Sequence, residues 1–212
     1  KSGGELLAHA PSIPHGGEHE VTSTGLNNRK LLMWAFLGSD CMFFGSLIAT
    51  YLVYQGKSIA GPLPADVFSI PVTSVSTFVL LMSSMSMVLS YAALTRGNIK
   101  AYRIWLASTA ILGATFLAFQ VFEFRDFVQH GLTPKTNLFG TTFFTLTGFH
   151  GAHVTLGVIW LLSLLFQSFR KGGASAENNL DLDLAALYWH FVDVVWIVIF
   201  TVVYLFGVFE GF

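Results

Sequence analysis

The chain has 212 residues, of which 53% are hydrophobic and only 11% charged, and its formal net charge is −1. Soluble domains carry about a quarter charged residues, so this composition, with a mean hydropathy of +0.63, predicts a membrane protein. The charge balance argues against a nucleic-acid partner, because phosphate binding needs a surplus of Lys and Arg. Cys41 is the single cysteine, which excludes a disulfide framework within the chain and a metal site built on a cysteine pair.

The first segment, residues 1–29, is rich in Gly, Ser, Pro and His and has no apolar run of its own. It therefore does not resemble a signal peptide. We expect a flexible polar tail here, followed by one membrane domain over residues 30–212.

A membrane-spanning helix needs about 20 predominantly apolar residues, and five stretches of the chain meet this requirement. The segments between them contain Gly, Pro, Asn or charged residues, as connecting loops do. The apolar runs are continuous and lack the alternation of a β-barrel. The predicted fold is all-α, a polytopic bundle of five transmembrane helices, with spans at about 31–54, 71–94, 102–128, 138–169 and 184–209.

Basic residues fall unevenly on the two sides of this predicted bundle. One side holds Lys1, Arg29, Lys30, Arg96, Lys100, Arg103, Arg170 and Lys171, and the other holds Lys57, Arg125 and Lys135. The positive-inside rule therefore places the N-terminus in the cytoplasm and the C-terminus outside. The acidic stretch 177–183, just before the fifth span, is predicted to be solvated.

Seven polar or titratable residues lie inside the predicted spans, where each charged group costs a few kcal/mol on insertion scales. Six of them form three pairs separated by three residues, so that the two members of a pair share a helix face. We expect these faces to point into the bundle and to form an intramembrane polar network. Its members are Asp40, Gln120, Glu123, His150, His153, His190 and Asp193. The serines of the second span, Ser83, Ser84 and Ser86, are interpreted as small residues that allow close helix packing.

A depth count divides the seven residues into two layers. With a rise of about 1.5 Å per residue, Asp40 lies about 14 Å from the cytoplasmic end of its span, and His150 and His153 lie about 24 to 29 Å from that end of theirs. We therefore expect an outer layer and an inner, cytoplasmic layer. The outer layer contains Gln120, Glu123, His150 and His153, and the inner layer contains Asp40, His190 and Asp193.

No metal or cofactor site is predicted in this chain, and no catalytic residue. Two histidines on one helix cannot take opposite sides of a haem, and His190 lies about 15 Å too deep to join them. A mononuclear metal needs three or four convergent ligands, and the outer layer offers two histidines and Glu123. A hydrogen-bonded carboxylate and imidazole network between helices explains the same residues, with Glu123 and helix hydroxyls as partners of His150 and His153. Asp40 has two interpretations, a proton relay and a structural hydrogen bond between helices.

Four segments in these spans resemble subunit III of the haem-copper terminal oxidases, in the five-helix form found in bacteria. The most specific are FHGAHVTLGVIW in the fourth span and YWHFVDVVWIVIFTVVYLFG in the fifth. GSDCMFF in the first span and FQVFEF in the third are similar to two further segments of that family. The resemblance extends from about residue 30 to the end of the chain.

The resemblance implies subunit III of a proton-pumping cytochrome c oxidase of the aerobic respiratory chain, in the bacterial plasma membrane. Such a subunit holds no redox centre, stabilises the catalytic subunit I and supports proton uptake. Haem and copper are then expected in subunits I and II. The implied partners are subunit I as the main contact, subunit II, a small subunit IV and membrane lipid, with a bound phospholipid.

The resemblance also raises a question about the role of Asp40 and leaves the electron donor of the oxidase open. Asp40 stands where many relatives have a carbodiimide-reactive Glu, and its side chain is one methylene shorter. The electron donor could be quinol instead of cytochrome c, because five-helix members of the family also occur in quinol oxidases. A more distant alternative is a stand-alone proton or ion transporter that uses Asp40, His190 and Asp193.

Overall fold

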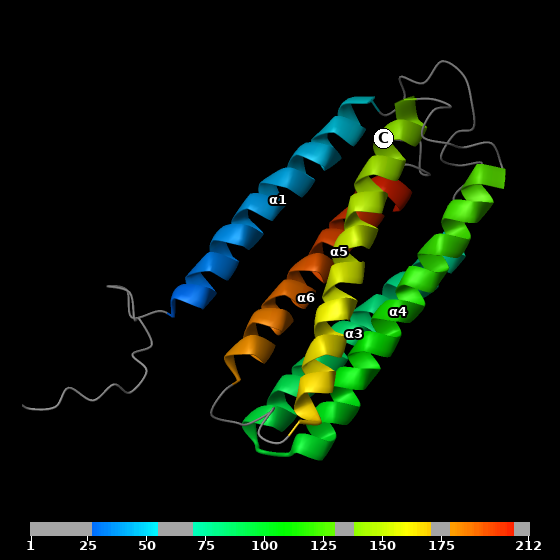
Figure 1. Cartoon of the computed structure of the whole chain (residues 1–212). Helices are drawn as coiled ribbons and strands as arrows, with labels where there is room; N and C mark the ends of the chain where they lie inside the picture. The colour runs from blue at the N-terminus through cyan, green and yellow to red at the C-terminus, as the bar shows by residue number, and fades with distance from the viewer. Residues whose placement is uncertain (1–26, 55–69, 130–137, 171–178, 206–212) are drawn as a thin grey trace, which may run out of the picture.

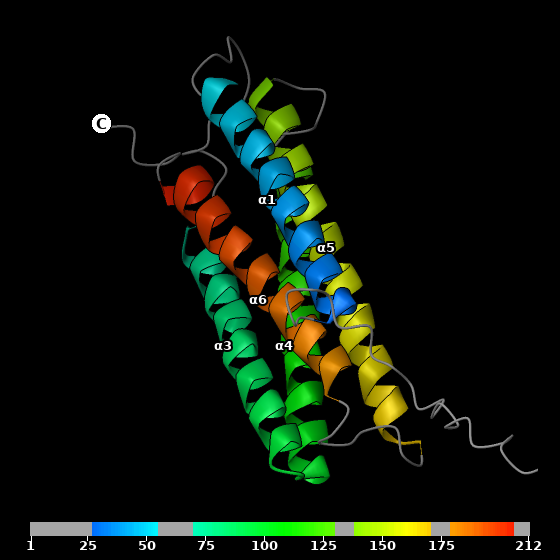
Figure 2. The same ribbon diagram turned by 90° about the vertical axis from the view of Figure 1, so that its left-hand side faces the viewer.

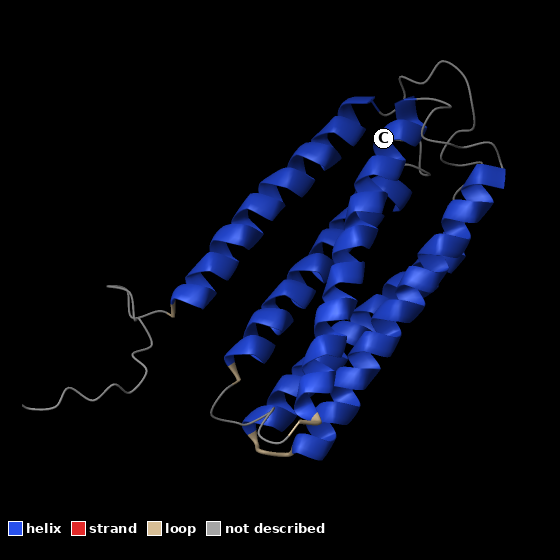
Figure 3. Ribbon diagram, viewed as in Figure 1, coloured by secondary structure: helices blue, strands red, loops and turns tan. Residues whose placement is uncertain are grey.

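The computed structural model of this chain describes residues 27–54, 70–129, 138–170 and 179–205. These residues form an elongated bundle of five helices that are long and apolar enough to cross a membrane (Figures 1 and 3). The predicted all-α fold with five spans is confirmed, whereas most of the predicted tail, residues 1–26, lies outside the described residues. In chain order the helices are α1 (Asn28–Tyr54), α3 (Ile70–Thr95), α4 (Ile99–Gln129), α5 (Leu138–Ser168) and α6 (Leu180–Ile199), which continues as the π-helix η1 (Phe200–Leu205).

The described part of the acidic stretch 177–183 is helical and ion-paired, and its aspartates Asp181 and Asp183 remain 44% and 30% exposed, in keeping with the predicted solvated segment. Residues 180–183 form the first turn of α6, where acidic side chains interact favourably with the helix dipole. Asp181 lies 2.9 Å from the guanidinium of Arg29, and Asp183 lies 2.7 Å from the ammonium of Lys30. The countercharges come from the first turn of α1, so α1 and α6 start at the same side of the bundle.

A tight turn joins α3 to α4. Gly97 has a φ of 73°, a left-handed conformation that a residue without a Cβ adopts at little cost. The amide of Asn98 donates to the carbonyl of Ala93 over 2.9 Å, which closes α3 as a Schellman motif. The Asn98 side chain then accepts a hydrogen bond from the amide of Ala101 over 3.1 Å and caps α4.

The core of the bundle forms around α6. Figure 2 shows α6 between α3 and α1, and it contacts α5 as well. The ring of Trp189 packs against two glycines on neighbouring helices, because a Cβ on Gly113 of α4 or Gly157 of α5 would lie 2.6 or 2.8 Å from it. The fit of the Trp189 ring between α4 and α5 therefore depends on these glycines.

Helix α1 is peripheral. It packs mainly against α5 and α6, whereas α3 and α4 contact each other along much of their length (Figure 2). Only 17% of its most apolar window is buried within the chain, compared with 33% to 44% for the other four helices. Most of the surface of α1 is therefore available to the membrane or to another protein.

Candidate functional site: an intramembrane polar network

The seven predicted polar residues all lie within the described helices. The side chains of Asp40, Gln120, Glu123, His150 and Asp193 are buried, and those of His153 and His190 are partly exposed. The structure does not join them into one network, but places them in separate groups that connect different pairs of helices.

The first group is a carboxyl and imidazole pair between α1 and α5. Oδ1 of Asp40 lies 3.3 Å from Nε2 of His153. The other ring nitrogen of His153, Nδ1, lies 2.7 Å from the carbonyl oxygen of Phe149. Because a carbonyl can only accept, Nδ1 carries a proton, and a neutral imidazole then has no proton on Nε2. The contact therefore pairs a carboxyl oxygen of Asp40 with a ring nitrogen of His153, an arrangement that fits both a neutral carboxyl with a neutral imidazole and a carboxylate with an imidazolium.

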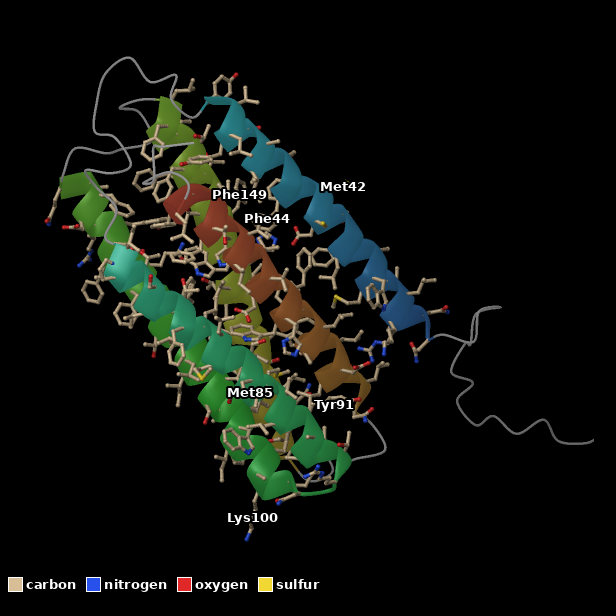
Figure 4. The ribbon with its side chains drawn as sticks, turned by 180° about the vertical axis from the view of Figure 1, so that it is seen from behind. Met42, Phe44, Met85, Tyr91, Lys100 and Phe149 are labelled. Atoms are coloured by element: carbon tan, nitrogen blue, oxygen red, sulfur yellow. The ribbon has the colours of Figure 1, made fainter. Side chains whose placement is uncertain are left out.

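Aromatic side chains surround this pair. The ring of Phe44 lies 5.1 Å from the His153 ring, and Phe43 makes an edge contact of 5.2 Å with Phe149. Figure 4 shows Phe44 and Phe149 between α1 and α5. The pair is nevertheless not sealed, because 17% of the His153 side chain and 8% of the Asp40 side chain are exposed. It thus combines an apolar setting, in which hydrogen bonds are strong, with limited access from outside the chain.

The predicted separation of Asp40 and His153 into two depth layers is wrong. With the observed ends of α1 and α5, Asp40 lies about 18 Å from Asn28, and His153 lies about 22 Å from Ser168. The predicted first span begins at residue 31, whereas α1 begins at Asn28, so the count from residue 31 placed Asp40 too close to the end of the helix. In addition, Figure 1 shows that α1 begins further along the bundle than the turn between α3 and α4. Helix ends are staggered, so a count from each end does not give a common depth.

The second group is a single histidine in an aromatic cage. His150 is fully buried and stacks on Trp196, with ring centroids 4.9 Å apart and planes at 26°. Phe116 and Phe44 present edge contacts at 6.0 and 6.4 Å. In the described part of the chain neither ring nitrogen has a hydrogen-bond partner. His150 therefore takes part in ring packing, and the predicted contact with Glu123 is absent from the described residues.

The third group ties α4 to its two neighbours. Nε2 of Gln120 donates to the carbonyl of Thr147 on α5 over 3.2 Å, and a Cβ on Gly151 would lie 3.1 Å from the Gln120 amide oxygen. Glu123 accepts a hydrogen bond from the hydroxyl of Thr73 on α3. The two residues are three positions apart on α4, yet they bond to different helices.

The fourth group uses hydroxyls of α3 that sequence reasoning interpreted only as packing residues. The hydroxyl of Ser84 lies 2.6 Å from Nδ1 of His190 and also interacts with the carboxyl of Asp193. The indole of Trp189 donates to Ser83 over 3.0 Å, and that of Trp196 donates to the hydroxyl of Thr77 over 3.0 Å. The signal in the sequence was the number of hydroxyl residues on one helix, which is more than close packing requires.

These groups connect neighbouring helices through polar contacts. Among the described residues no three His, Cys, Asp or Glu side chains come together as metal ligands do. The partners are hydroxyls, backbone carbonyls and, in one case, a carboxyl with an imidazole. Of the groups described above, only Asp40 with His153 joins two titratable side chains by a direct polar contact.

Comparison with known proteins assigns the chain. A family model described as cytochrome c oxidase subunit III matches residues 14–208. The chain belongs to this family. Its five membrane-length helices and its bacterial relatives make it a multi-pass bacterial membrane protein. As a member of this family it is subunit III of a haem-copper oxidase.

Relatives in this family differ in the electron donor that their names state. Cytochrome c oxidase subunit 3 of Bacillus sp. strain PS3 is 38% identical over 198 residues, which is 93% of this chain and 95% of that protein. Cytochrome bo(3) ubiquinol oxidase subunit 3 of Pseudomonas aeruginosa is 38% identical over 201 residues, 95% of each chain. Quinol oxidase subunit 3 of Bacillus spizizenii is 39% identical over 174 residues, 82% of this chain and 85% of its own. The chain is equally similar to subunits from both types of oxidase, so its sequence does not indicate which electron donor the complex uses.

Proposed function

We propose that the chain is subunit III of a proton-pumping cytochrome c oxidase, that it carries no redox centre, and that it stabilises subunit I and supports proton uptake. Haem and copper are held by subunits I and II. Subunit I is the main partner, with subunit II and a small subunit IV nearby. A phospholipid and the bulk membrane lipid cover the exposed apolar side chains.

The pair of Asp40 and His153 carries the proton part of this proposal. Its two heavy atoms lie 3.3 Å apart, a separation that a shared proton could bridge, and part of the imidazole remains accessible. In the proposed orientation α1 starts in the cytoplasm, so a proton that enters from that side reaches Asp40 after about 18 Å. A group that shares a proton without fixing a separated charge can accept and release it at low cost in an apolar setting.

Asp40→Ala tests the proton role in the purified oxidase. Oxygen reduction should remain partly intact, while proton uptake slows or the enzyme inactivates sooner during turnover. Asp40→Glu, which restores the carboxyl with one more methylene, should recover most of the lost behaviour. Oxygen consumption and proton uptake measured over many turnovers check this, and wild-type behaviour of Asp40→Ala throughout would reject the proton role.

A quinol oxidase is the second candidate, and the 38% identity over 95% of the Pseudomonas aeruginosa ubiquinol oxidase subunit supports it. The two candidates differ in the electron donor that the oxidase accepts. Purified complex that consumes oxygen with reduced cytochrome c supports the first candidate, and activity with quinol alone supports the second.

Affinity purification of the tagged chain tests membership of the complex directly. We expect two larger subunits and a haem absorbance spectrum in the eluate, and no haem absorbance in the chain once it is separated from them. A chain that purifies alone and moves protons or ions in liposomes would instead be a stand-alone transporter.

A further inference from the structure

The phenol of Tyr188 connects α6 to the helix that carries His153. Its hydroxyl donates to the backbone carbonyl oxygen of His153 over 2.9 Å, and only 5% of Tyr188 is exposed. Inside α5 the same oxygen accepts the amide four residues further along the helix, that of Gly157. The phenol is therefore a second donor, and it comes from a different helix. Its hydrogen bond adds a constraint on α5 that the helix does not need for its own structure.

The ring of Tyr188 also lies against α1. It stacks on Phe36, with ring centroids 6.3 Å apart and planes at 28°. Phe36 is one helical turn before Asp40, so the two side chains share a face of α1, and Asp40 interacts electrostatically with the phenol. Figure 2 shows α1 and α5 on the same side of α6. One side chain of α6 therefore contacts both helices that carry the pair of Asp40 and His153.

Packing fixes the direction in which this hydroxyl points. A Cβ on Gly157 would lie 3.2 Å from Cε1 of the Tyr188 ring, so the ring lies directly against the backbone of α5. The ring of Trp160, also on α5, is 5.8 Å from the phenol ring, with planes at 50°. Together with Phe36 these residues enclose the phenol. A side chain whose rotamer is locked by its neighbours holds its polar atom in one place, so the hydroxyl is preorganised toward His153.

The contact between Asp40 and His153 depends on how α5 lies against α1. Nδ1 of His153 donates to the carbonyl of Phe149 over 2.7 Å, so the imidazole is tied to its own helix and moves with it. Its Nε2 lies 3.3 Å from Oδ1 of Asp40, whereas hydrogen bonds between nitrogen and oxygen are usually about 2.7 to 3.2 Å long. The contact is already at the long end of this range, so a small shift between the two helices would break it.

We propose that Tyr188 is a positioning residue for the pair of Asp40 and His153. Its hydroxyl holds the backbone of His153, and its ring holds α1 at the separation that keeps the two side chains in contact. The inference rests on the proposed function, because the pair carries its proton part. Tyr188 itself neither takes nor gives the proton. Without its hydroxyl, the carboxyl and the imidazole separate more often.

Tyr188→Phe in the complete purified oxidase removes the hydroxyl and keeps the ring. Separation of the pair exposes the Asp40 carboxyl to a hydrophobic carbodiimide, and mass spectrometry of the Asp40 peptide gives the rate of its modification. Loss of one hydrogen bond between membrane helices should raise this rate about threefold. Tyr51→Phe is the matched control, because Tyr51 is also buried and its hydroxyl has no hydrogen-bond partner in the described part of the chain. An unchanged rate in Tyr188→Phe, or the same increase in both variants, would contradict the proposal.

Proton uptake over many turnovers separates positioning from a general loss of stability. Tyr188→Phe should slow uptake less than Asp40→Ala does, and the double variant should behave as Asp40→Ala alone, because the tyrosine acts through the pair. A further loss in the double variant would show that Tyr188 acts elsewhere and would overturn the inference. Wild-type uptake by Asp40→Ala would instead reject the proton role in the proposed function, and the carbodiimide rate would still decide whether Tyr188 positions the pair.

Discussion

The first and last helices of this chain run side by side from a common end, yet they are held in the bundle by different means. Helix α6 is held by ring insertion into glycines of α4 and α5 and by indole hydrogen bonds to α3. Helix α1 is held by two ion pairs at its start, by Asp40 with His153 near its middle, and by aromatic contacts. Apolar side chains gain little by leaving lipid for protein. The few polar contacts of α1 therefore matter more to its position than its many apolar residues, and a helix held in this way is well placed to respond to a partner.

The largest effect should come from the core around α6. Gly157→Ala adds a Cβ that would lie 2.8 Å from the ring of Trp189, and overpacking of this kind costs about 2 kcal/mol. Thermal unfolding in detergent measures the loss. Gly148→Ala is the matched control on the same helix, because a Cβ there meets nothing within 4 Å, and similar losses for both variants would show that α6 is not fixed by this contact.

The attachment of α1 should show as an interaction energy between Asp40 and His153. A double-mutant cycle with Asp40→Asn and His153→Gln, read by unfolding in detergent, should give a coupling of about 1 to 2 kcal/mol, the upper range for polar contacts between membrane helices. Additive effects of the two changes would mean that the pair does not hold α1 to α5.

Loss of one hydroxyl in the core should cost about 1 kcal/mol. Thr77→Val keeps the shape of the side chain but removes the acceptor of the Trp196 indole, and a buried donor is left unpaired. Thr50→Val on α1 removes an exposed hydroxyl that bonds only within its own helix and should have almost no effect. The same unfolding assay separates the two, and equal stabilities would argue that the α3 hydroxyls contribute only packing.

The smallest effect should come from the ion pair at the common end of α1 and α6. Arg29 and Asp181 are 63% and 44% exposed, and exposed pairs contribute about 0 to 1 kcal/mol. Arg29→Ala should therefore lower stability slightly at low salt, and the difference from wild type should vanish at about 1 M salt, where charges are screened within about 3 Å. A loss that persists at high salt would point to packing of the Arg29 side chain instead.

The spacing of residues along the sequence predicted which polar side chains are buried in the bundle, but not which helix each of them contacts. The rule that residues three apart share a face selected His150 with His153 and Gln120 with Glu123. In the structure His153 faces Asp40 while His150 is enclosed by rings, because a face of one helix turns toward more than one neighbour. Gln120 and Glu123 separate in the same way, toward α5 and α3.

The sequence by itself determined five membrane-length helices, the position of most of their ends to within a few residues, and the family through four short segments. These follow from local properties, since hydropathy and length decide whether a segment can cross a membrane. Only the tertiary structure decided that Asp40 lies against His153, that α3 supplies the hydroxyl partners, and that α1 lies at the edge. Those facts depend on how far each helix is shifted along its neighbours, and the shift is set by packing between residues far apart in the chain, such as Trp189 against Gly113 and Gly157.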